Sequence, residues 1–197
     1  SLAAAEPARP RIGLVLGGGG ARGTAHVGVL EVLEELRVPV DCIAGTSMGS
    51  LVAGAYLSGV RPRQMMERLA QVDWYDLFRD DPARGETNYR ERRLAQSYYP
   101  GLEAGVTLEG TQMARGIVGG QKVKLFFNSL VGADRAERTI GTLPLPLAII
   151  ATDIGNGERV AMRSGNLTSA MRASMSVPGA IAPVVRDGRK LVDGGLV

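Results

Sequence analysis

The first 60 residues alternate between short apolar runs and longer segments with helical spacing, which predicts two consecutive strand–helix units. Residues 12–16 form an apolar run of strand length, and apolar residues recur at helical spacing over about residues 24–37. A second apolar run at 40–44 predicts another strand, and a helix is expected directly after Ser47. This alternation indicates an α/β fold, with a mostly parallel central sheet sandwiched by helices.

The rest of the chain first loses this alternation and then regains it. Residues 63–72 predict a helix, whereas residues 74–142 form a variable segment that holds eight of the nine aromatic side chains. The elements expected after it are a strand at 147–152, a hairpin turn at Asn156-Gly157 leading into 159–162, and a second hairpin over 184–192.

The composition is that of one ordinary globular domain. The chain has 197 residues, of which 45% are hydrophobic and 22% charged, which is enough for one sizeable core. No apolar run approaches the roughly 18 residues of a membrane-spanning helix. The net charge of +3 comes from interspersed acidic and basic side chains, which argues against a nucleic-acid partner. Residues 1–10 predict a flexible, alanine-rich leader of the kind that a cleaved signal peptide leaves, and residues 11–197 predict the domain.

Cys42 is the only cysteine of the chain. An intrachain disulfide and a cysteine-based metal site are therefore excluded. Because Cys42 lies in a predicted strand, we expect it to be buried as a small apolar residue and not to act as a nucleophile.

A glycine-rich loop over Gly17–Gly23 joins the first predicted strand to the first predicted helix. Its backbone N–H groups, with the positive end of a helix dipole behind them, favour an anion. One interpretation is a cofactor phosphate, because Gly18, Gly20 and Gly23 match G-x-G-x-x-G and Asp41 has the spacing of a ribose-binding acid. The other interpretation is an oxyanion hole for a tetrahedral acyl intermediate.

The second predicted strand leads into the pentapeptide Gly45-Thr46-Ser47-Met48-Gly49. A G-x-S-x-G sequence between a strand and a helix is typical of a nucleophile elbow, in which the serine hydroxyl projects from a strained corner. Glycines on either side allow the two backbones to cross closely. The elbow favours the oxyanion-hole interpretation of the glycine loop, because a dinucleotide site does not need it.

A serine nucleophile needs a base, and the chain has a single histidine, His26. His26 lies before Ser47 in the sequence, in the helix after the glycine loop, so we expect it to pack or hydrogen-bond there. Asp193 is the first candidate base, because it follows a short apolar strand and precedes two glycines; Asp153, which also ends a strand, is the second. A buried aspartate that is hydrogen-bonded to the serine is able to act as the base directly.

Three motifs together resemble the signature of the patatin-like phospholipase family. They occur in the family's order and at similar separations: Gly18-Gly19-Gly20-Ala21-Arg22-Gly23, Gly45-Thr46-Ser47-Met48-Gly49 and Asp193-Gly194-Gly195. The segment Ala173-Ser174-Met175-Ser176-Val177-Pro178 resembles a further block that the family carries before its aspartate. The likeness runs from about Arg11 to the end of the chain, although residues 74–142 contribute no matching motif.

The resemblance implies hydrolysis of the fatty-acyl esters of phospholipids by a Ser–Asp dyad without histidine, metal or cofactor. Ser47 would be the nucleophile and Asp193 its base. The oxyanion hole would be formed by the backbone at Gly18, Gly19 and Gly20, within the motif that Ala21, Arg22 and Gly23 complete. The elbow motif adds Gly45, Thr46, Met48 and Gly49, and the D-G-G motif adds Gly194 and Gly195.

The same resemblance implies a phospholipid or other acyl-ester lipid as substrate and transient contact with a membrane surface. Residues 74–142 would then be a lid or a substrate-binding insertion, with side chains that meet anionic headgroups at Arg90, Arg92, Arg93, Lys122 and Lys124. A solvated surface of mixed charge is the favoured interpretation, because seven acids lie among eight basic residues between positions 74 and 127. Trp74 and Phe126-Phe127 are expected in the core.

The resemblance further indicates a bacterial protein that is secreted or associated with the outer membrane, with a cytoplasmic location as the alternative; no pattern indicates an oligomeric state. Family members continue past their D-G-G motif, whereas this sequence ends at Val197. We therefore expect a fold that is truncated at its C-terminus, with the position of Asp193 left open. Two other functions stay as alternatives: a dinucleotide-binding module that uses Gly18–Gly23, and a non-catalytic lipid-binding domain.

Overall fold

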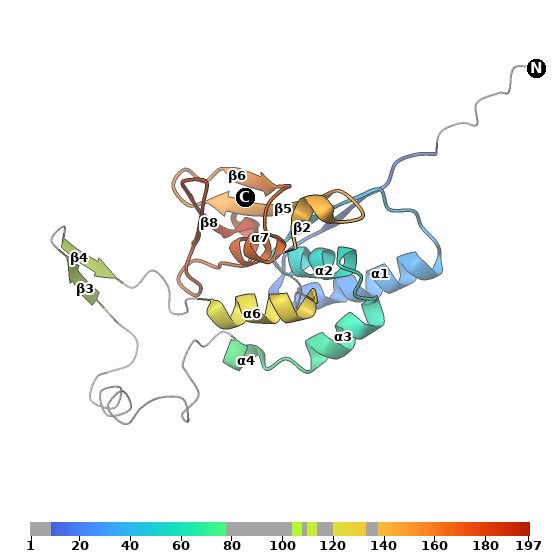
Figure 1. Cartoon of the computed structure of the whole chain (residues 1–197), viewed down its shortest axis with the longest axis horizontal. Coiled ribbons are helices and arrows are strands. Elements are labelled where there is room, and N and C mark those ends of the chain that lie inside the picture. Colours follow the sequence, from blue (N-terminus) through green and yellow to red (C-terminus); the bar gives the residue numbers. More distant parts are fainter. Residues whose placement is uncertain (1–8, 78–103, 108–109, 114–119, 133–137) are drawn as a thin grey trace, which may run out of the picture.

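The computed structural model describes residues 9–77, 104–107, 110–113, 120–132 and 138–197 of the chain (Figure 1). Its main sheet has six strands. These are β1 (Gly13–Leu16), β2 (Cys42–Thr46), β5 (Leu147–Asp153), β6 (Arg159–Met162), β7 (Val184–Arg186) and β8 (Arg189–Asp193). Strands β1, β2 and β5 are parallel, while β6 and β8 pair antiparallel with β5, and β7 pairs antiparallel with β8. The predicted α/β class and both predicted hairpins are confirmed.

Strand β5 has neighbours on both sides, and the order of those neighbours positions the candidate site. It pairs with β2 over residues 147–150, with β6 over 149–152 and with β8 over 151–153. Residues 149–150 of β5 pair with both β2 and β6, and residues 151–152 pair with both β8 and β6. Because a strand residue has one neighbouring strand on each side, β2 and β8 both lie on the side of β5 opposite β6. The carboxyl ends of β2 and β8 therefore meet beside the adjacent residues Ile150 and Ala151.

The helices of the described chain lie mostly below the strands in the view of Figure 1. They are α1 (Ala25–Glu35), α2 (Met48–Leu57), α3 (Pro62–Ala70), α4 (Trp74–Leu77), α6 (Gln121–Leu130) and α7 (Leu167–Ser174), with short 3-10 helices η1 (Gly20–Thr24), η2 (Ile140–Thr142) and η3 (Gly194–Leu196). Helices α6 and α7 were not among the elements expected from the sequence. A separate two-stranded ribbon pairs β3 (Ala104–Thr107) with β4 (Gly110–Met113).

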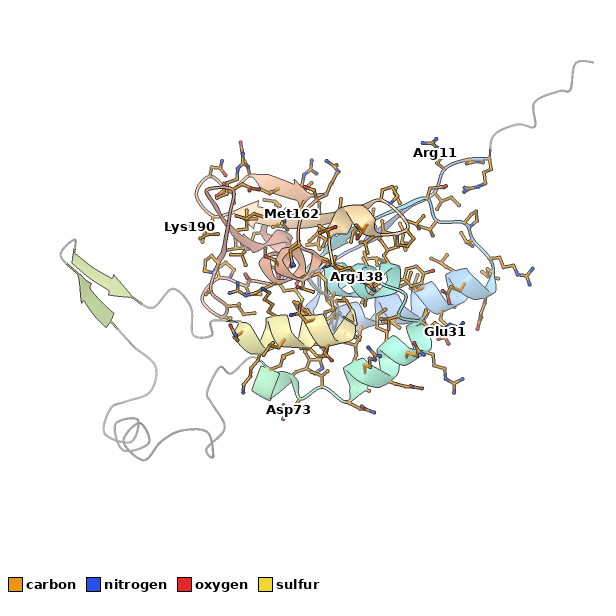
Figure 2. All side chains as sticks on the ribbon, in the orientation of Figure 1. Arg11, Glu31, Asp73, Arg138, Met162 and Lys190 are labelled. Carbon is orange, nitrogen blue, oxygen red and sulfur yellow. The ribbon has the colours of Figure 1, made fainter. Side chains whose placement is uncertain are left out.

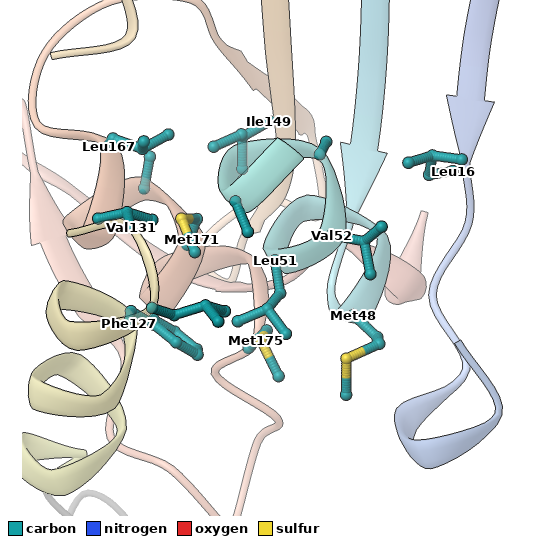
Figure 3. Packing of buried hydrophobic residues seen from close by; sticks show 14 of the residues in the cluster. Leu16, Met48, Leu51, Val52, Phe127, Val131, Ile149, Leu167, Met171 and Met175 are labelled. Atoms are coloured by element: carbon teal, nitrogen blue, oxygen red, sulfur yellow. The ribbon is translucent and has the colours of Figure 1, made fainter. Parts of the chain in front are cut away.

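Helix α2 lies at the centre of the core. All its residues except Tyr56 are buried, which explains why its sequence is apolar on every side. Figure 3 shows Leu51 of this helix on the side of Phe127 of α6 and Met171 of α7, and Val52 on the opposite side, toward Leu16 of β1. A central helix that is packed on all sides gives the residue at its N-terminus, Ser47, a rigid support.

The expected core aromatics occupy the positions predicted for them. Phe127 is fully buried, and Phe126 and Trp74 pack against the core with their rings 6.2 Å apart in an edge-to-face arrangement. Charged side chains such as Arg11, Glu31 and Lys190 are exposed at the periphery (Figure 2). Arg90, Arg92 and Arg93, with most of the predicted insertion and all but two residues of the predicted leader, lie outside the described residues.

The prediction that Cys42 is buried is wrong, because its thiol lies on the open face of the sheet. Along β2, Ile43 and Gly45 face the helices and are buried, whereas Cys42 is exposed. Strand alternation places Val15 of β1 on the same open face, and Val15 is 76% exposed. The apolar pattern identified the strand, but it did not show which of its two faces is covered.

Candidate active site

Ser47 occupies a sharp corner between β2 and α2, as the G-x-S-x-G motif predicts. Strand β2 ends at Thr46 and helix α2 begins at Met48. Ser47 has φ of 50° and ψ of −122°, and it is 8% exposed. A non-glycine residue with such a positive φ costs about 1–3 kcal/mol and persists only where its surroundings hold it in place. The strain marks Ser47 as a candidate functional residue.

The glycines of the elbow allow backbones to approach closely. A Cβ atom on Gly45 would lie 2.7 Å from Ser50 Cα, and one on Gly49 would overlap the carbonyl group of Leu16. Both contacts involve backbone atoms, which are unable to move aside. These two positions therefore require glycine for a steric reason, which is the reason the motif predicts.

Asp193 accepts the hydroxyl hydrogen bond of Ser47. The distance from Ser47 Oγ to Asp193 Oδ2 is 2.7 Å, and the other carboxylate oxygen accepts the N–H of Gly195, also at 2.7 Å. Asp193 is 8% exposed. The carboxylate is thus buried, oriented by a backbone donor and directed at the serine.

The backbone of Asp193 is also held on both sides. Its N–H donates to the carbonyl of Ser176 at 2.9 Å, and its carbonyl accepts from Thr152 Oγ1 at 2.9 Å. A Cβ on Gly194 would overlap the carbonyl oxygen of Ile150, so the chain passes β5 too closely for any other residue there. Asp193, whose position the sequence left open, is therefore fixed at the end of β8.

The glycine loop borders Ser47. A Cβ on Gly18 would lie 3.3 Å from Ser47 Cβ, and one on Gly23 would lie 2.6 Å from Met48 Cβ. Gly19 and Gly20 have φ of 150° and 54°, conformations that glycine adopts without strain. Residues 17–22 are exposed, so their backbone borders solvent beside the buried serine.

The other candidate bases have different hydrogen-bond partners. His26 Nε2 is 2.9 Å from the carbonyl oxygen of Gly17, and the ring thus contacts the glycine loop. Asp153 accepts the N–H of Gly155 at 2.9 Å and lies 4.0 Å from the Arg189 guanidinium. Neither side chain is a hydrogen-bond partner of Ser47 in the described structure.

The residues of the dinucleotide interpretation are not brought together. Asp41 forms a bidentate ion pair with Arg9 at 2.6 and 2.8 Å and accepts the N–H of Ile12 at 2.7 Å. The Arg9 hydrogen bonds lower the pKa of Asp41 to about 2. Asp41 precedes β2, whereas Gly17–Gly23 follows β1. Because these strands are parallel, Asp41 lies at the amino ends of the strands and the glycine loop at their carboxyl ends.

Two further observations concern metals and membranes. Among the described residues, no group of three or more His, Cys, Asp or Glu side chains is arranged to hold a metal ion. In the same part of the chain, none of the helices combines the length and the apolar character needed to cross a bilayer.

Ser174 is a site residue whose contact the sequence did not predict. Its hydroxyl accepts the N–H of Ser47 at 2.8 Å and donates to the carbonyl of Ile150. The only signal in the sequence was the resemblance of the segment Ala173–Pro178 to a family block. That resemblance assigned no contact to its individual residues.

Comparison with known proteins identifies a family. The family described as Patatin-like phospholipase matches residues 14–197. An NTE family protein of Mycobacterium tuberculosis is 34% identical over 188 residues, which cover 95% of this chain and 43% of that protein. Patatin-like phospholipase domain-containing protein 6 of Mus musculus is 34% identical over 190 residues, 94% of this chain and 12% of that protein. Lysophospholipase NTE1 of Cryptococcus neoformans is 32% identical over 185 residues, 94% of this chain and 10% of that protein.

Solved structures share the fold at low sequence identity. VipD from Legionella pneumophila matches with a TM-score of 0.51 and 16% identity over 95% of this chain and 46% of its own. The type III effector protein ExoU matches with a TM-score of 0.54 and 18% identity over 87% of this chain and 40% of its own. The chain spans less than half the length of these relatives. By the match over residues 14–197, the chain belongs to the patatin-like phospholipase family.

Proposed function

We propose that this protein is a serine hydrolase that cleaves fatty-acyl esters of phospholipids with Ser47 as nucleophile and Asp193 as base. The observation that carries the proposal is the 2.7 Å hydrogen bond from Ser47 Oγ to a buried, oriented carboxylate oxygen. The strained backbone of Ser47 and the exposed glycine loop beside it support the same chemistry.

Acylation begins when Ser47 Oγ attacks the ester carbonyl and its proton passes to Asp193 Oδ2. Charge develops on the carbonyl oxygen, and backbone N–H groups at Gly18, Gly19 and Gly20 stabilise it. Collapse of this intermediate breaks the ester C–O bond, and the protonated Asp193 returns its proton to the leaving alcohol. The product at this stage is an acyl ester of Ser47.

Deacylation repeats these proton transfers with water. Asp193 takes a proton from a water molecule as its oxygen attacks the acyl carbonyl. The second tetrahedral intermediate releases the fatty acid, and Ser47 regains its proton from Asp193. No metal or cofactor takes part in this cycle.

The proposed substrate class is a phospholipid or lysophospholipid, met at a membrane surface. The name of the Cryptococcus neoformans relative states lysophospholipase activity for that protein, and shared family membership supports the extension to this chain. The secreted or outer-membrane-associated location stays a prediction from the sequence.

Fatty-acid release from lysophosphatidylcholine micelles and phosphatidylcholine vesicles tests the proposal. We expect Ser47→Ala to abolish release and Asp193→Asn to reduce it by about 10²–10⁴-fold. Asp153→Asn is the matched control for the aspartate, because Asp153 also ends a strand and is also 8% exposed. Ser58→Ala is the control for the serine, because the buried Ser58 hydroxyl has no hydrogen-bond partner among the described residues. Full activity of Ser47→Ala, or equal losses in Asp193→Asn and Asp153→Asn, would contradict the proposal.

A further inference from the structure

The hydrogen-bond ladder between β2 and β5 is interrupted at Ser47. Ile43 pairs with Leu147 and donates its N–H to the carbonyl of Pro146. In a parallel ladder this pattern repeats every two residues. Two rungs further along, the same pattern would join the N–H of Ser47 to the carbonyl of Ile150.

That rung is blocked by the end of β8. A continued β2 would place Ser47 opposite Ala151, but Asp193 occupies that position. The chain turns out of the sheet at Ser47, where φ becomes positive. A buried N–H and a backbone carbonyl are thus left without their ladder partners, and each then needs another hydrogen bond.

The hydroxyl of Ser174 fills this gap. It accepts the N–H of Ser47 at 2.8 Å and donates to the carbonyl of Ile150, so it is inserted into the missing rung. Ser174 is the last residue of α7 and is fully buried. Two residues later, the carbonyl of Ser176 accepts the N–H of Asp193 at 2.9 Å. One short segment therefore contacts the backbone of both the serine and the aspartate.

We propose that Ser174 is a positioning residue, whose hydroxyl holds Ser47 in the strained conformation from which Oγ reaches Asp193. The inference rests on the proposed function and adds a residue that touches neither substrate nor the reacting atoms. Without the hydroxyl, the Ser47 N–H has no acceptor, and the elbow is free to relax toward ordinary dihedral angles. A displacement of about 1 Å at a reacting group is enough to cost roughly 100-fold in rate.

The test compares Ser174→Ala with Thr168→Val. Both side chains are buried in α7, but the hydroxyl of Thr168 donates to Asn166 Oδ1 at 3.1 Å and makes no hydrogen bond to Ser47 in the described structure. With a soluble short-chain ester, we expect Ser174→Ala to lower kcat about 10- to 100-fold with KM changed less than about twofold. Thr168→Val, which removes a buried hydroxyl from the same helix, should keep kcat within about twofold. Ser174→Cys keeps a side chain of similar shape, and its weakly accepting sulfur should also lower kcat, which covers the case in which Ser174→Ala fails to fold.

Amide hydrogen exchange at Ser47 is a second readout that does not depend on activity. We expect faster exchange of this amide in Ser174→Ala and Ser174→Cys, with no change in Thr168→Val. Equal kcat values for the Ser174 and Thr168 variants, an effect on KM alone, or unchanged exchange at Ser47 would overturn the inference. An inactive wild-type protein with the expected exchange pattern would instead overturn the proposed function and leave the structural role of Ser174 supported.

Discussion

Ser47 and Asp193 are 146 positions apart in the chain, yet their side chains share a hydrogen bond of 2.7 Å. They meet because β2 and β8 run toward each other along one side of β5 and end beside the adjacent residues Ile150 and Ala151. The sheet itself therefore sets the distance between the proposed nucleophile and the proposed base, and the glycine loop is the proposed source of the oxyanion donors.

A dyad without histidine predicts a small effect of removing His26. Its ring nitrogen lies 2.9 Å from the carbonyl oxygen of Gly17 and makes no hydrogen bond to Ser47 in the described structure. We expect His26→Ala to lower kcat less than about 10-fold, against about 10²–10⁴-fold for Asp193→Asn. Steady-state kinetics on a soluble ester measure both values. A loss in His26→Ala as large as that in Asp193→Asn would show that the base is assigned wrongly.

Alanine substitutions at two glycines of the loop test whether the loop takes part in catalysis. A Cβ on Gly18 would press on Ser47 Cβ at 3.3 Å, whereas one on Gly17 would meet nothing within 4 Å. We expect Gly18→Ala to lower kcat about 10- to 100-fold by displacing oxyanion donors from the serine, while Gly17→Ala stays within about twofold. Comparable kcat values in the two variants would remove the loop from the proposed mechanism.

Two helical glycines predict stability changes of opposite sign. In Gly49→Ala the new methyl group would overlap the Leu16 carbonyl, and we expect a loss of about 3 kcal/mol. In Gly28→Ala of α1 the methyl group meets nothing within 4 Å, and helix propensity should stabilise the protein by about 0.5–1 kcal/mol. Urea unfolding measures both free energies, and a stabilising Gly49→Ala would contradict the close crossing of the elbow.

The ion pair between Arg9 and Asp41 predicts a contribution to stability at the acidic end of the pH range. The pKa of Asp41 is lowered to about 2 by Arg9, below the ordinary value of about 3.9. A lowered pKa stabilises the folded state above the unfolded-state value, and the contribution is lost as pH falls through about 4 toward 2.

Removing the arginine tests this assignment. We expect NMR titration to show the pKa of Asp41 rising toward its ordinary value in Arg9→Ala. The variant should be less stable than the wild type near neutral pH, and the difference should shrink as the pH falls toward 2. The difference should also be smaller at high salt. A stability difference that grows on acidification would exclude the ion pair as its cause.

The sequence was sufficient to predict the strands of the main sheet, both hairpins and the backbone corner at Ser47. Each feature it predicted correctly depends on neighbouring residues: apolar runs for strands, Asn156-Gly157 for a hairpin, and G-x-S-x-G for the corner at Ser47. The glycines at 45 and 49 were expected for the steric reason that the structure supplies. Such features can be predicted from a sequence because the residues that cause them lie within a few positions of one another.

Features that depend on distant segments were missed. Exposure of Cys42 depends on which face of the sheet the helices cover, and no local pattern reports that. Helix α7 is an exception, because it was missed although the signal for its start is local: the Asn166 side chain accepts the N–H of Ser169 at 2.8 Å. The contact of Ser174 with Ser47 joins residues 127 positions apart and arises only when β8 displaces β2 beside Ala151.

The most direct measurement of the central claim is reaction with a fluorophosphonate, followed by mass-spectrometric mapping of the adduct. The proposed mechanism predicts a single stoichiometric adduct on Ser47, absent in Ser47→Ala and formed at least about 100-fold more slowly in Asp193→Asn. Asp153→Asn should react at the rate of the wild type. A folded wild-type protein that forms no adduct, or one whose adduct maps to another serine, would contradict the assignment of Ser47 as the nucleophile.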